Sequence, residues 1–439
     1  MGLGYFQLTV TNEEDKYLVG NPEFTYFKTL YKRHTNFAIE NVVLNFSGET
    51  KMDNNYGKKI YTNIPKNGDL LHRMYLIIDT DYLGTQKELI DNIGVSAFSL
   101  IDYIELSIGD QVIDKHTGEW LHIYHEHFID NSKNSLLCEM INIHNTTRTT
   151  DKSQRDGLLY IPLIFWFNKN PGLALPLLAL NNSNIKLSVK FSSKNKIYNS
   201  KTFDKKFIIN SVQLLAEYIH LDTEEKRLFA TNSHEYLIEQ LQYNDFNNVP
   251  QKLEEFGGDD DYEKYLHKFN IPFNHPIKEL FWCVQDSNGN NNIKNIGNNI
   301  FNYWLDLDTD TRQHQVIEGY ITLNGKELFE PKSANYLMSV LKYQYHSGYG
   351  YTNLNVKNPD ETFTVRYDKG SGIYCYSFAL FPEEYQPSGS LNFSALDKVE
   401  LNLRLRRKKE NNGNQKLIKF FAINYNILKI VSGQGGLLF

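Results

Sequence analysis

Short stretches in which apolar and polar residues alternate recur along the whole chain. Such alternation is the pattern of a half-buried β-strand, and clusters of Asn, Gly, Asp and Ser between the stretches are typical of turns. The clearest stretches are YLIIDT, YIELSI, LLYIPLIFWF, IKLSVKF, FIINSVQLLAEYIHL, IKELFWCV, YITLNG, GIYCYSFALF, VELNLRLR and FFAINYNILKIV. Little of the chain shows a helical period, so the pattern predicts an all-β fold built from β-sandwiches.

The clearest helical stretch, DTEEKRLFA, begins at Asp222, almost midway along the 439 residues. Asp222 suits the N-cap position, and Glu225, three residues further on, suits the reciprocal position of a capping box. A chain of this length is too long for one ordinary sandwich and fits two domains of about 200 residues each. We therefore expect a short linking helix between two β-domains.

The two halves of the chain repeat similar strand patterns in the same order. IELSIGDQVID resembles ITLNGKELFE, IKLSVKF resembles VELNLRLR, and NGDLLHRMYLII pairs more loosely with FNHPIKELFWCV. The paired stretches begin at Ile104 and Ile321, at Ile185 and Val399, and at Asn67 and Phe273, which gives offsets of 217, 214 and 206 residues. Similar offsets in one order indicate a duplicated β-domain.

The segment from Gly20 to Glu40, GNPEFTYFKTLYKRHTNFAIE, combines aromatic and basic side chains. Its aromatic residues are Phe24, Tyr26, Phe27, Tyr31 and Phe37, and its basic residues are Lys28, Lys32, Arg33 and His34. It begins with Asn-Pro, which favours a turn, and runs into IENVVLNF, which alternates as a strand does. Either a core or a partner surface must cover so many rings.

The charge of the chain argues against a protein that wraps nucleic acid. The net charge is −6, whereas binding to phosphates needs a concentrated basic surface. One basic run precedes the loop ENNGNQ and consists of Arg404, Arg406, Arg407, Lys408 and Lys409. Such a run is typical of a solvated hairpin end, with binding of nucleic acid or another acidic partner as the alternative.

Cysteine usage and the terminal sequence favour a soluble intracellular product. Cys138, Cys283 and Cys375 form neither a disulfide framework nor a zinc pattern, so we expect free, mostly buried thiols. The N-terminal residues show no secretory signal, and Phe6 stands where a myristoylation motif after Gly2 needs Ser or Thr. No apolar run approaches the length of a membrane span.

Two clusters resemble metal sites at first sight. In HIYHEH, His122 and His125 can share a helical face, whereas His125 and His127 can share only a strand face. A hydrogen-bonded or interface role therefore explains this cluster better than a metal. Asp259–Asp261, extended by Glu263, lacks the ordered spacing of a calcium loop.

No catalytic motif withstands inspection. His234 and Glu235 begin HEYLI, but Ile238 stands where a zinc protease needs its second histidine, and no helix is expected after Gly433–Gly436 to bind a phosphate. Acidic pairs such as Asp306 with Asp308, and Glu383 with Glu384, suit glycoside hydrolysis but are too common to discriminate. We expect no catalytic, cofactor-binding or metal-ligating residues and no cofactor. Four glycosylation sequons begin at Asn45, Asn145, Asn181 and Asn392, most of them by chance.

The stretches that fit no enzyme do resemble one family. GNPEFTYFKTLYKRHTNFAIE is similar to the N-terminal signature of the double jelly-roll major capsid proteins of nucleocytoplasmic large DNA viruses, of the type found in viruses of algae and protists. Further similar blocks are NGDLLHRM at 67–74, IGDQVIDKHTGEW at 108–120, PLIFWFNKNPGLALPLLAL at 162–180, LDTEEKRLFATNSHEYLIEQLQ at 221–242, FNHPIKELFW at 273–282, YSFALFPEEYQPSGSLNFSALD at 376–397 and INYNILKIVSGQGGLLF at 423–439. The polar inserts near residues 256 and 287 depart from that pattern.

The resemblance implies an all-β fold of two consecutive eight-stranded jelly-roll β-sandwiches, a double jelly roll with a short linking helix and loop insertions. The implied parts are an N-terminal arm at the capsomer base over 1–24, a first jelly roll over 25–221, a linking helix over 222–233, and a second jelly roll with a C-terminal strand over 234–439. Three copies would form a pseudo-hexagonal capsomer that tiles an icosahedral virion shell.

The partners implied by the resemblance are two further copies in a homotrimer, neighbouring capsomers, and minor capsid and penton proteins. An internal membrane is implied only indirectly, glycans on surface loops are possible, and no specific nucleic acid is expected. The location is the virion capsid, assembled in the host cytoplasm. Two alternatives stay open: a double jelly-roll scaffold protein of immature virions, and a carbohydrate-active β-sandwich protein.

Overall fold

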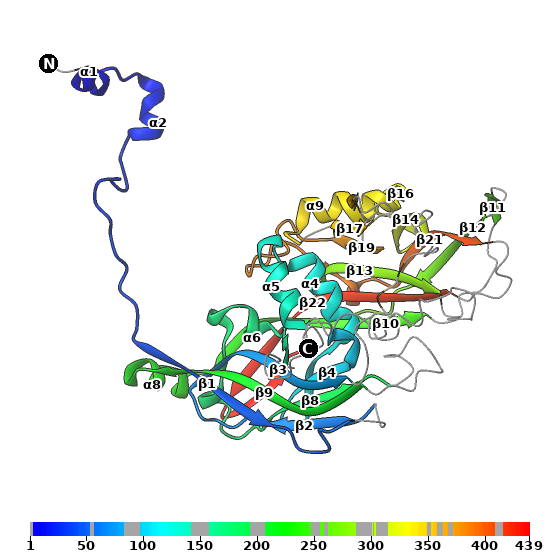
Figure 1. The fold of residues 1–439 in the computed structure, drawn as a ribbon. Coiled ribbons are helices and arrows are strands. Elements are labelled where there is room, and N and C mark those ends of the chain that lie inside the picture. Colours follow the sequence, from blue (N-terminus) through cyan, green and yellow to red (C-terminus); the bar gives the residue numbers. More distant parts are fainter. Residues whose placement is uncertain are drawn as a thin grey trace. The chain divides into compact units, whose positions relative to one another are not determined.

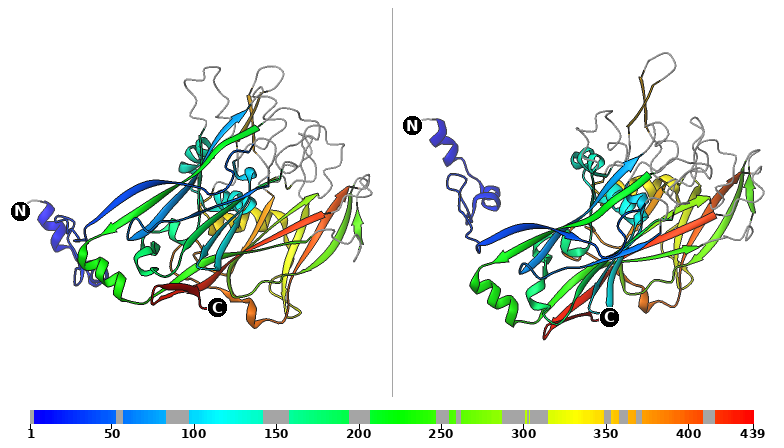
Figure 2. Two further views of the ribbon diagram at one scale, coloured as in Figure 1. Left: turned by 90° about the horizontal axis from the view of Figure 1, so that it is seen from below. Right: turned by 60° about the horizontal axis from the view of Figure 1, so that its bottom comes forward.

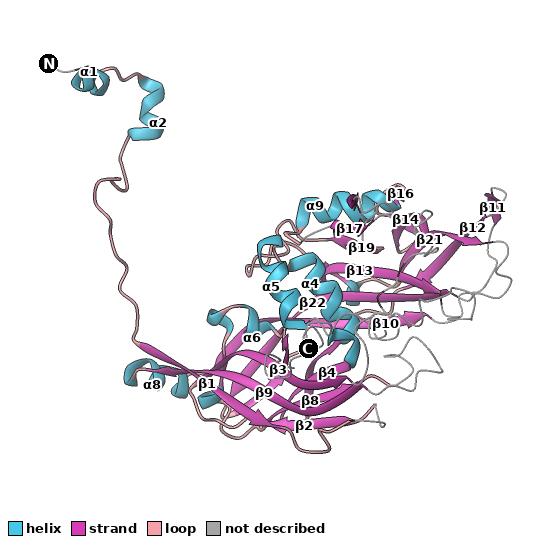
Figure 3. Ribbon diagram, in the orientation of Figure 1, coloured by secondary structure: helices cyan, strands magenta, loops and turns pink. Residues whose placement is uncertain are grey.

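The computed structural model describes residues 3–52, 57–82, 97–141, 158–193, 207–246, 255–258, 262–286, 301, 303, 315–348, 353–357, 363–367, 372–408 and 416–439. The chain divides into two compact units, Met1–Phe37 and Ala38–Phe439. The large unit is built mainly of strands, which Figure 3 draws in magenta. Among the described residues, no helix is both long enough and apolar enough to span a membrane.

The N-terminal unit contains short helices followed by an extended segment. The helices are α1 (Leu3–Thr9), η1 (Glu13–Asp15) and α2 (Lys16–Val19). A capping box starts η1, because the Asn12 side chain accepts from the Glu13 backbone and the Asn12 N–H donates to Asp15. Residues 29–36 contain no turn and no regular element. The first strand of the chain, β1, begins at Phe37.

The first half of the large unit contains two antiparallel sheets. One sheet has the order β1 (Phe37–Asn45), β9 (Phe207–Leu221), β3 (Leu70–Tyr82), β6 (Leu158–Pro162), with the short β7 (Leu175–Pro176) also paired to β3. The other has the order β2 (Lys59–Asn63), β8 (Ile185–Phe191), β4 (Ile101–Ile108), β5 (Gln111–Thr117). In β2, Ile60 and Thr62 point to the core while their neighbours are exposed, which is the alternation that predicted a strand.

The second half repeats this arrangement. One sheet has the order β10 (His234–Phe246), β22 (Lys416–Val431), β13 (Pro276–Asp286), β19 (Ile373–Ser377), with β20 (Leu391–Asn392) on β13 and β23 (Gln434–Leu437) on β22. The other has the order β11 (Glu255–Gly258), β12 (Tyr262–Asn270), β21 (Val399–Lys408), β14 (Val316–Leu323), β15 (Lys326–Glu327), with β16 (Lys332–Ser333) on β14. A separate hairpin joins β17 (Asn353–Lys357) to β18 (Phe363–Tyr367).

The strand orders confirm the predicted duplication. The matched pairs from the sequence fall on equivalent strands: β4 with β14, β8 with β21, and β3 with β13. The hairpin after β4 and the hairpin after β14 each turn through a glycine in the left-handed region. This glycine is Gly109, at φ 61°, in the first half and Gly325, at φ 81°, in the second. The fold is a double jelly roll, whose two sets of sheets are visible in Figures 1 and 2.

Helices cover the connections between strands. They include α4 (Gly118–Phe128), α5 (Asn131–Ile141), α6 (Trp166–Lys169), α8 (Thr223–Thr231) and α9 (Leu341–Tyr345), the last preceded by a π-helical turn, η7 (Tyr336–Val340). The short 3-10 turns are η2 (Ala97–Leu100), η5 (Pro171–Leu173), η6 (Leu177–Ala179) and η8 (Phe393–Ala395). The linking helix is α8: Asp222 accepts from the Glu225 backbone N–H at 2.9 Å, whereas the reciprocal half of the predicted capping box is not formed.

Two expectations about local structure were wrong. The run LLYIPLIFWF is a strand only as far as Pro162, and Trp166 already starts the helix α6. The sequence also gave no sign of α4 and α5, although together they occupy most of residues 118–141. One continuous apolar core runs through both jelly rolls, and its largest fully buried side chains include Trp282, Tyr218 and Tyr374.

Candidate functional site

The helix α4 lies between the two jelly rolls and joins them (Figure 1). Its Trp120 ring packs against Phe281 of β13 and Phe421 of β22, with ring centroids 5.4 Å and 5.8 Å away. Its Glu119 pairs with Lys419 of β22, and Glu126 lies 3.2 Å from the Lys342 ammonium of α9. All three contacted elements belong to the second jelly roll, so α4 connects the first roll to it.

Two of the three histidines of α4, His125 and His127, are buried hydrogen-bond donors. His125 Nδ1 lies 2.7 Å from the Leu121 carbonyl, and His127 Nδ1 lies 3.0 Å from the Ile123 carbonyl. Burial lowers the pKa of His125 to about 4 and holds the pKa of His127 well below its ordinary value. Both rings are therefore neutral at neutral pH and donate their Nδ1–H to the helix itself.

The remaining member of the predicted cluster, His122, faces another way. It stacks on Phe301 with ring centroids 4.4 Å apart, and its Nε2 lies 3.6 Å from Glu126. Over the described ranges, no group of three or more His, Cys, Asp and Glu side chains is placed to hold a metal ion. The residues of HIYHEH therefore have hydrogen-bonding and interface roles. His125 and His127 bond to backbone carbonyls of α4, and Glu126 contacts the second jelly roll.

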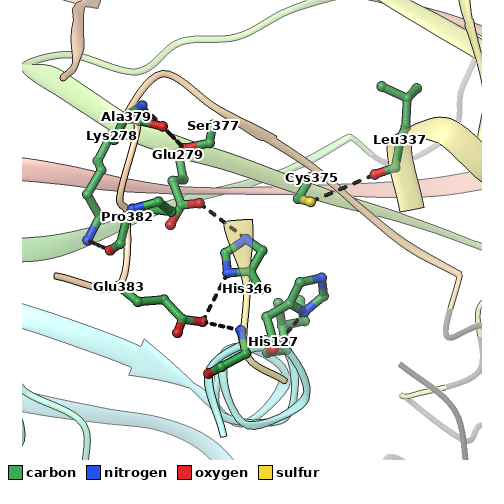
Figure 4. Close-up of polar contacts among 12 residues, drawn as sticks. His127, Lys278, Glu279, Leu337, His346, Cys375, Ser377, Ala379, Pro382 and Glu383 are labelled. Carbon is green, nitrogen blue, oxygen red and sulfur yellow. Dashed lines mark hydrogen bonds and ion pairs between the residues drawn. The ribbon is translucent and has the colours of Figure 1, made fainter. Parts of the chain in front are cut away.

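A buried charged cluster lies next to α4 (Figure 4). His346, just after α9, places Nε2 3.2 Å from Glu279 of β13 and Nδ1 3.5 Å from Glu383. The side chains of His346 and Glu279 are both 0% exposed. Burial by itself lowers the pKa of His346, but the attraction of Glu279 and the contacts to Glu383 outweigh it and raise that pKa well above its ordinary value. The two carboxylates therefore favour the imidazolium form of His346.

The backbone after His346 is fixed to α4. The Ser347 N–H donates to Glu383 at 2.8 Å, and the Gly348 N–H donates to the His127 carbonyl at 2.7 Å. A Cβ on Gly348 would lie 2.2 Å from the Glu126 carbonyl oxygen, so only glycine fits here. The charged cluster thus holds a segment of the second roll against a helix of the first.

A second ion network crosses the same interface. Glu239 of β10 lies 3.0 Å from Lys169 of α6 and also pairs with Lys278 of β13. Lys278 donates to the Pro382 carbonyl at 2.8 Å, and the Tyr385 hydroxyl donates to the Lys169 carbonyl at 2.9 Å. Burial alone would raise the pKa of Glu239, but the two lysines lower it to about 2. This carboxylate stays charged because cations of both rolls surround it.

The glycine-rich C-terminal motif has a structural role at this interface. Gly433 lies at φ 80° in the turn between β22 and β23. Its carbonyl accepts from the Asn182 backbone N–H at 2.9 Å, and the Gly435 N–H donates to the Ser183 hydroxyl at 3.3 Å. A Cβ on Gly433 would lie 2.8 Å from the Asn182 side chain. The motif lets a hairpin of the second roll approach the first roll closely.

A cavity of about 350 Å³ also opens between the rolls, and its charges are largely paired with one another. Lys190 lies 2.9 Å from Asp102, Lys419 pairs with Glu119, and the Lys115 ammonium lies 4.0 Å above the Tyr103 ring. Within the described part of the chain, this lining contains no nucleophile held by a base. The cavity is therefore lined largely by polar and charged side chains that contact one another.

Other residues singled out in the sequence have ordinary structural roles. Glu383 belongs to the His346 cluster, and Arg404 pairs with Glu318 of β14 at 2.7 Å. All three cysteines are free, with Cys283 and Cys375 buried and Cys138 exposed. In two sequons the asparagine side chain is engaged, since Asn45 accepts from Gln213 and Asn392 accepts from the Ser394 N–H. Asp259–Asp261, Asp306, Asp308, Asn145 and Lys409 lie outside the described residues.

The N-terminal unit exposes its rings. Phe27 is 98% exposed, Tyr31 and Tyr26 are each 89% exposed, and Phe24 is 64% exposed. Among the described residues of this unit none is buried. Taken by itself, this unit therefore does not gather its rings into a core.

Comparison with known proteins identifies the family. Residues 25–222 match the N-terminal region of major capsid proteins, and residues 225–436 match the major capsid proteins of large eukaryotic DNA viruses. The major capsid protein of Pyramimonas orientalis virus is 36% identical over 449 aligned residues, with 100% of both chains covered. That of Paramecium bursaria Chlorella virus 1 is 30% identical, again with 100% of both chains covered.

A solved structure agrees. The crystal structure of PBCV-1 VP54, fitted into a reconstruction of the virophage Sputnik, matches with a TM-score of 0.69 at 28% identity. The match covers 94% of this chain and 100% of that one. The repeated jelly-roll topology described above agrees with this match. The chain belongs to the major capsid protein family of large eukaryotic DNA viruses.

Proposed function

We propose that three copies of this chain form a pseudo-hexagonal capsomer and that such capsomers tile an icosahedral shell. The observation that supports this most directly is the repeated topology of the two jelly rolls within one compact unit. Three chains bring six similar domains, and six similar domains around a three-fold axis give a nearly hexagonal outline.

The joint between the rolls supports the same proposal. A capsomer with fixed edges needs its two domains held in one orientation. Trp120 supplies apolar packing across that joint, and the pairs Glu126–Lys342 and Glu239–Lys169 supply attraction between charges across it. The His346 cluster fixes the segment of the second roll that is bonded to α4. The role is structural and non-enzymatic, and the place of action is the virion, with assembly in the host cytoplasm.

We further propose the domain roles expected from the resemblance. The first jelly roll extends over 25–221 and the second over 234–439, and the arm over 1–24 lies at the base of the capsomer. There it reaches neighbouring capsomers and minor capsid or penton proteins. Deleting residues 1–24 should leave the oligomer folded but impair assembly of shells, because the body keeps its core. Normal assembly of the truncated chain would remove this role from the arm.

Negative-stain electron microscopy of the purified chain tests the proposal. We expect uniform particles with a pseudo-hexagonal outline. Persistent monomers that bind or cleave glycans would instead favour a carbohydrate-active protein. A scaffold protein of immature virions would be absent from mature particles, so mass spectrometry of purified virions separates scaffold from capsid.

A further inference from the structure

The segment 24–36 prefers a strand but forms none. It is rich in aromatic and β-branched residues, which favour strands, and it contains neither Gly nor Pro. Its apolar side chains alternate between two faces, with Phe24, Tyr26 and Leu30 on one and Phe27 and Tyr31 on the other. The structure nevertheless gives it no strand, and its rings are exposed. A local preference that conflicts with the observed state indicates an absent pairing partner.

The strand β1 offers a free edge. It ends the order of its sheet, and among the described residues it pairs along its length only with β9 (Figure 2). From Phe37 to Asn41 every residue is exposed, and Phe37, Ile39 and Val43 are 52%, 53% and 48% exposed. No Lys, Arg or Pro stands in β1 to block pairing. A long apolar edge of this kind is a template for a strand of another chain.

We propose that the segment 24–36 of one chain adds as a strand along the free edge of β1 in a second copy of this chain. This inference rests on the proposed function, in which copies assemble side by side. Every copy supplies one such segment and one such edge, so the exchange leaves neither unpaired. Main-chain hydrogen bonds would join the strands, and the added rings would cover Ile39 and Val43.

Charge and connectivity favour a second copy as the occupant. Between Phe24 and Phe37 the segment carries Lys28, Lys32 and Arg33 and no acidic residue. Residues 1–37 hold equal numbers of acidic and basic side chains, so the rest of the chain carries the whole net charge of −6. The same chain's β1 follows the segment directly, and pairing with it would need a tight turn that residues 29–36 do not contain.

Photo-crosslinking of the full-length chain tests the proposal. The variant Tyr31→p-benzoylphenylalanine is co-assembled from ¹⁵N-labelled and unlabelled chains, irradiated as purified oligomers and as shells, and digested for mass spectrometry. We expect crosslinks from position 31 to peptides that contain β1, about half of them joining a labelled to an unlabelled peptide. The same probe in place of Tyr17, which is 94% exposed, should not reach β1.

Substitutions on the acceptor strand give a second readout. The double variant Ile39→Lys with Val43→Lys should reduce the mixed-isotope crosslinks at least about fivefold, whereas Val112→Lys on β5, at a residue 46% exposed, should not. Sedimentation of the same samples measures their oligomeric state and so distinguishes failure of the strand exchange from failure of the proposed function. Oligomers whose crosslinks stay within single chains, or miss β1 in both preparations, would overturn the strand exchange alone, whereas monomers would overturn the proposed function as well.

Discussion

His346 Nε2 lies 3.2 Å from Glu279 Oε1, and neither side chain is exposed. His346 lies just after α9 and Glu279 lies in β13, and the backbone that follows His346 is bonded to α4 of the first jelly roll. The pair therefore links the charge state of one imidazole to the joint between the two rolls.

The pH dependence of stability follows from the raised pKa of His346. The pair stabilises the fold in full below the ordinary histidine pKa of 6.5, and this contribution is lost as the pH rises through the higher folded pKa. We expect the apparent Tm to fall on the alkaline side, measured by scanning calorimetry across that range. His346→Gln should flatten this fall, and an unchanged alkaline profile in that variant would contradict the assignment.

Removing the positive charge should also cost stability at neutral pH. His346→Ala leaves Glu279 buried without its partner, and breaking a buried pair in this way typically costs about 3–5 kcal/mol. The variant Glu279→Gln with His346→Gln should recover part of the loss, because no uncompensated charge remains. Chemical denaturation of the single and double variants measures the coupling, and a double variant as unstable as the sum of the single ones would show that the two residues act independently.

Acid should also lower the stability of the fold, because the pKa of His125 in α4 is lowered, whereas that of His346 is raised. Burial lowers the pKa of His125 to about 4. Below pH 6.5, His125 is therefore protonated in the unfolded chain but stays neutral in the folded chain. Stability should fall as the pH decreases from about 6.5 toward 4. His125→Gln should reduce that fall, whereas the exposed His34→Gln should leave it unchanged. Equal acid sensitivity in all three proteins would contradict a buried neutral His125.

Backbone contact at Gly348 predicts a severe effect of a single methyl group. A Cβ there would lie 2.2 Å from the Glu126 carbonyl and 2.3 Å from the His127 carbonyl, so Gly348→Ala must push the segment away from α4. We expect a loss of about 3 kcal/mol or more, seen as a lower Tm and faster proteolysis between the rolls. Gly4→Ala, where nothing lies within 4 Å, is the matched control. Equal stability of both variants would show that the segment yields without cost.

The sequence predicted many of the strands because apolar residues recur in strand-length runs along the chain, as in β4 and β8. Alternation alone located β4, β8 and their counterparts β14 and β21, and the repeated order predicted the duplication. The helix α4 was not predicted because it is buried between the two rolls. Its interior-facing residues lie on several sides of the helix, so no polar stripe marks the helical period; they are Trp120, Leu121, Ile123, His125 and His127.

The joint between the rolls could not be predicted for a different reason. Glu119 and Lys419 are 300 residues apart in sequence, and Glu126 and Lys342 are 216 apart. Charged residues of this kind are common in the chain, and only the folded arrangement shows which of them meet. The GQGG motif shows the same limit, since a Cβ on Gly433 would meet Asn182 and a Cβ on Gly435 would meet Leu180, and both neighbours are distant in sequence.

The mass of the purified full-length chain in solution tests the central claim most directly. Analytical ultracentrifugation at neutral pH should give a single species of three times the chain mass, stable on dilution, because an obligate trimer buries a large apolar interface. A species of one chain mass at all concentrations, still folded by circular dichroism, would contradict the assignment of this double jelly roll to a trimeric capsomer.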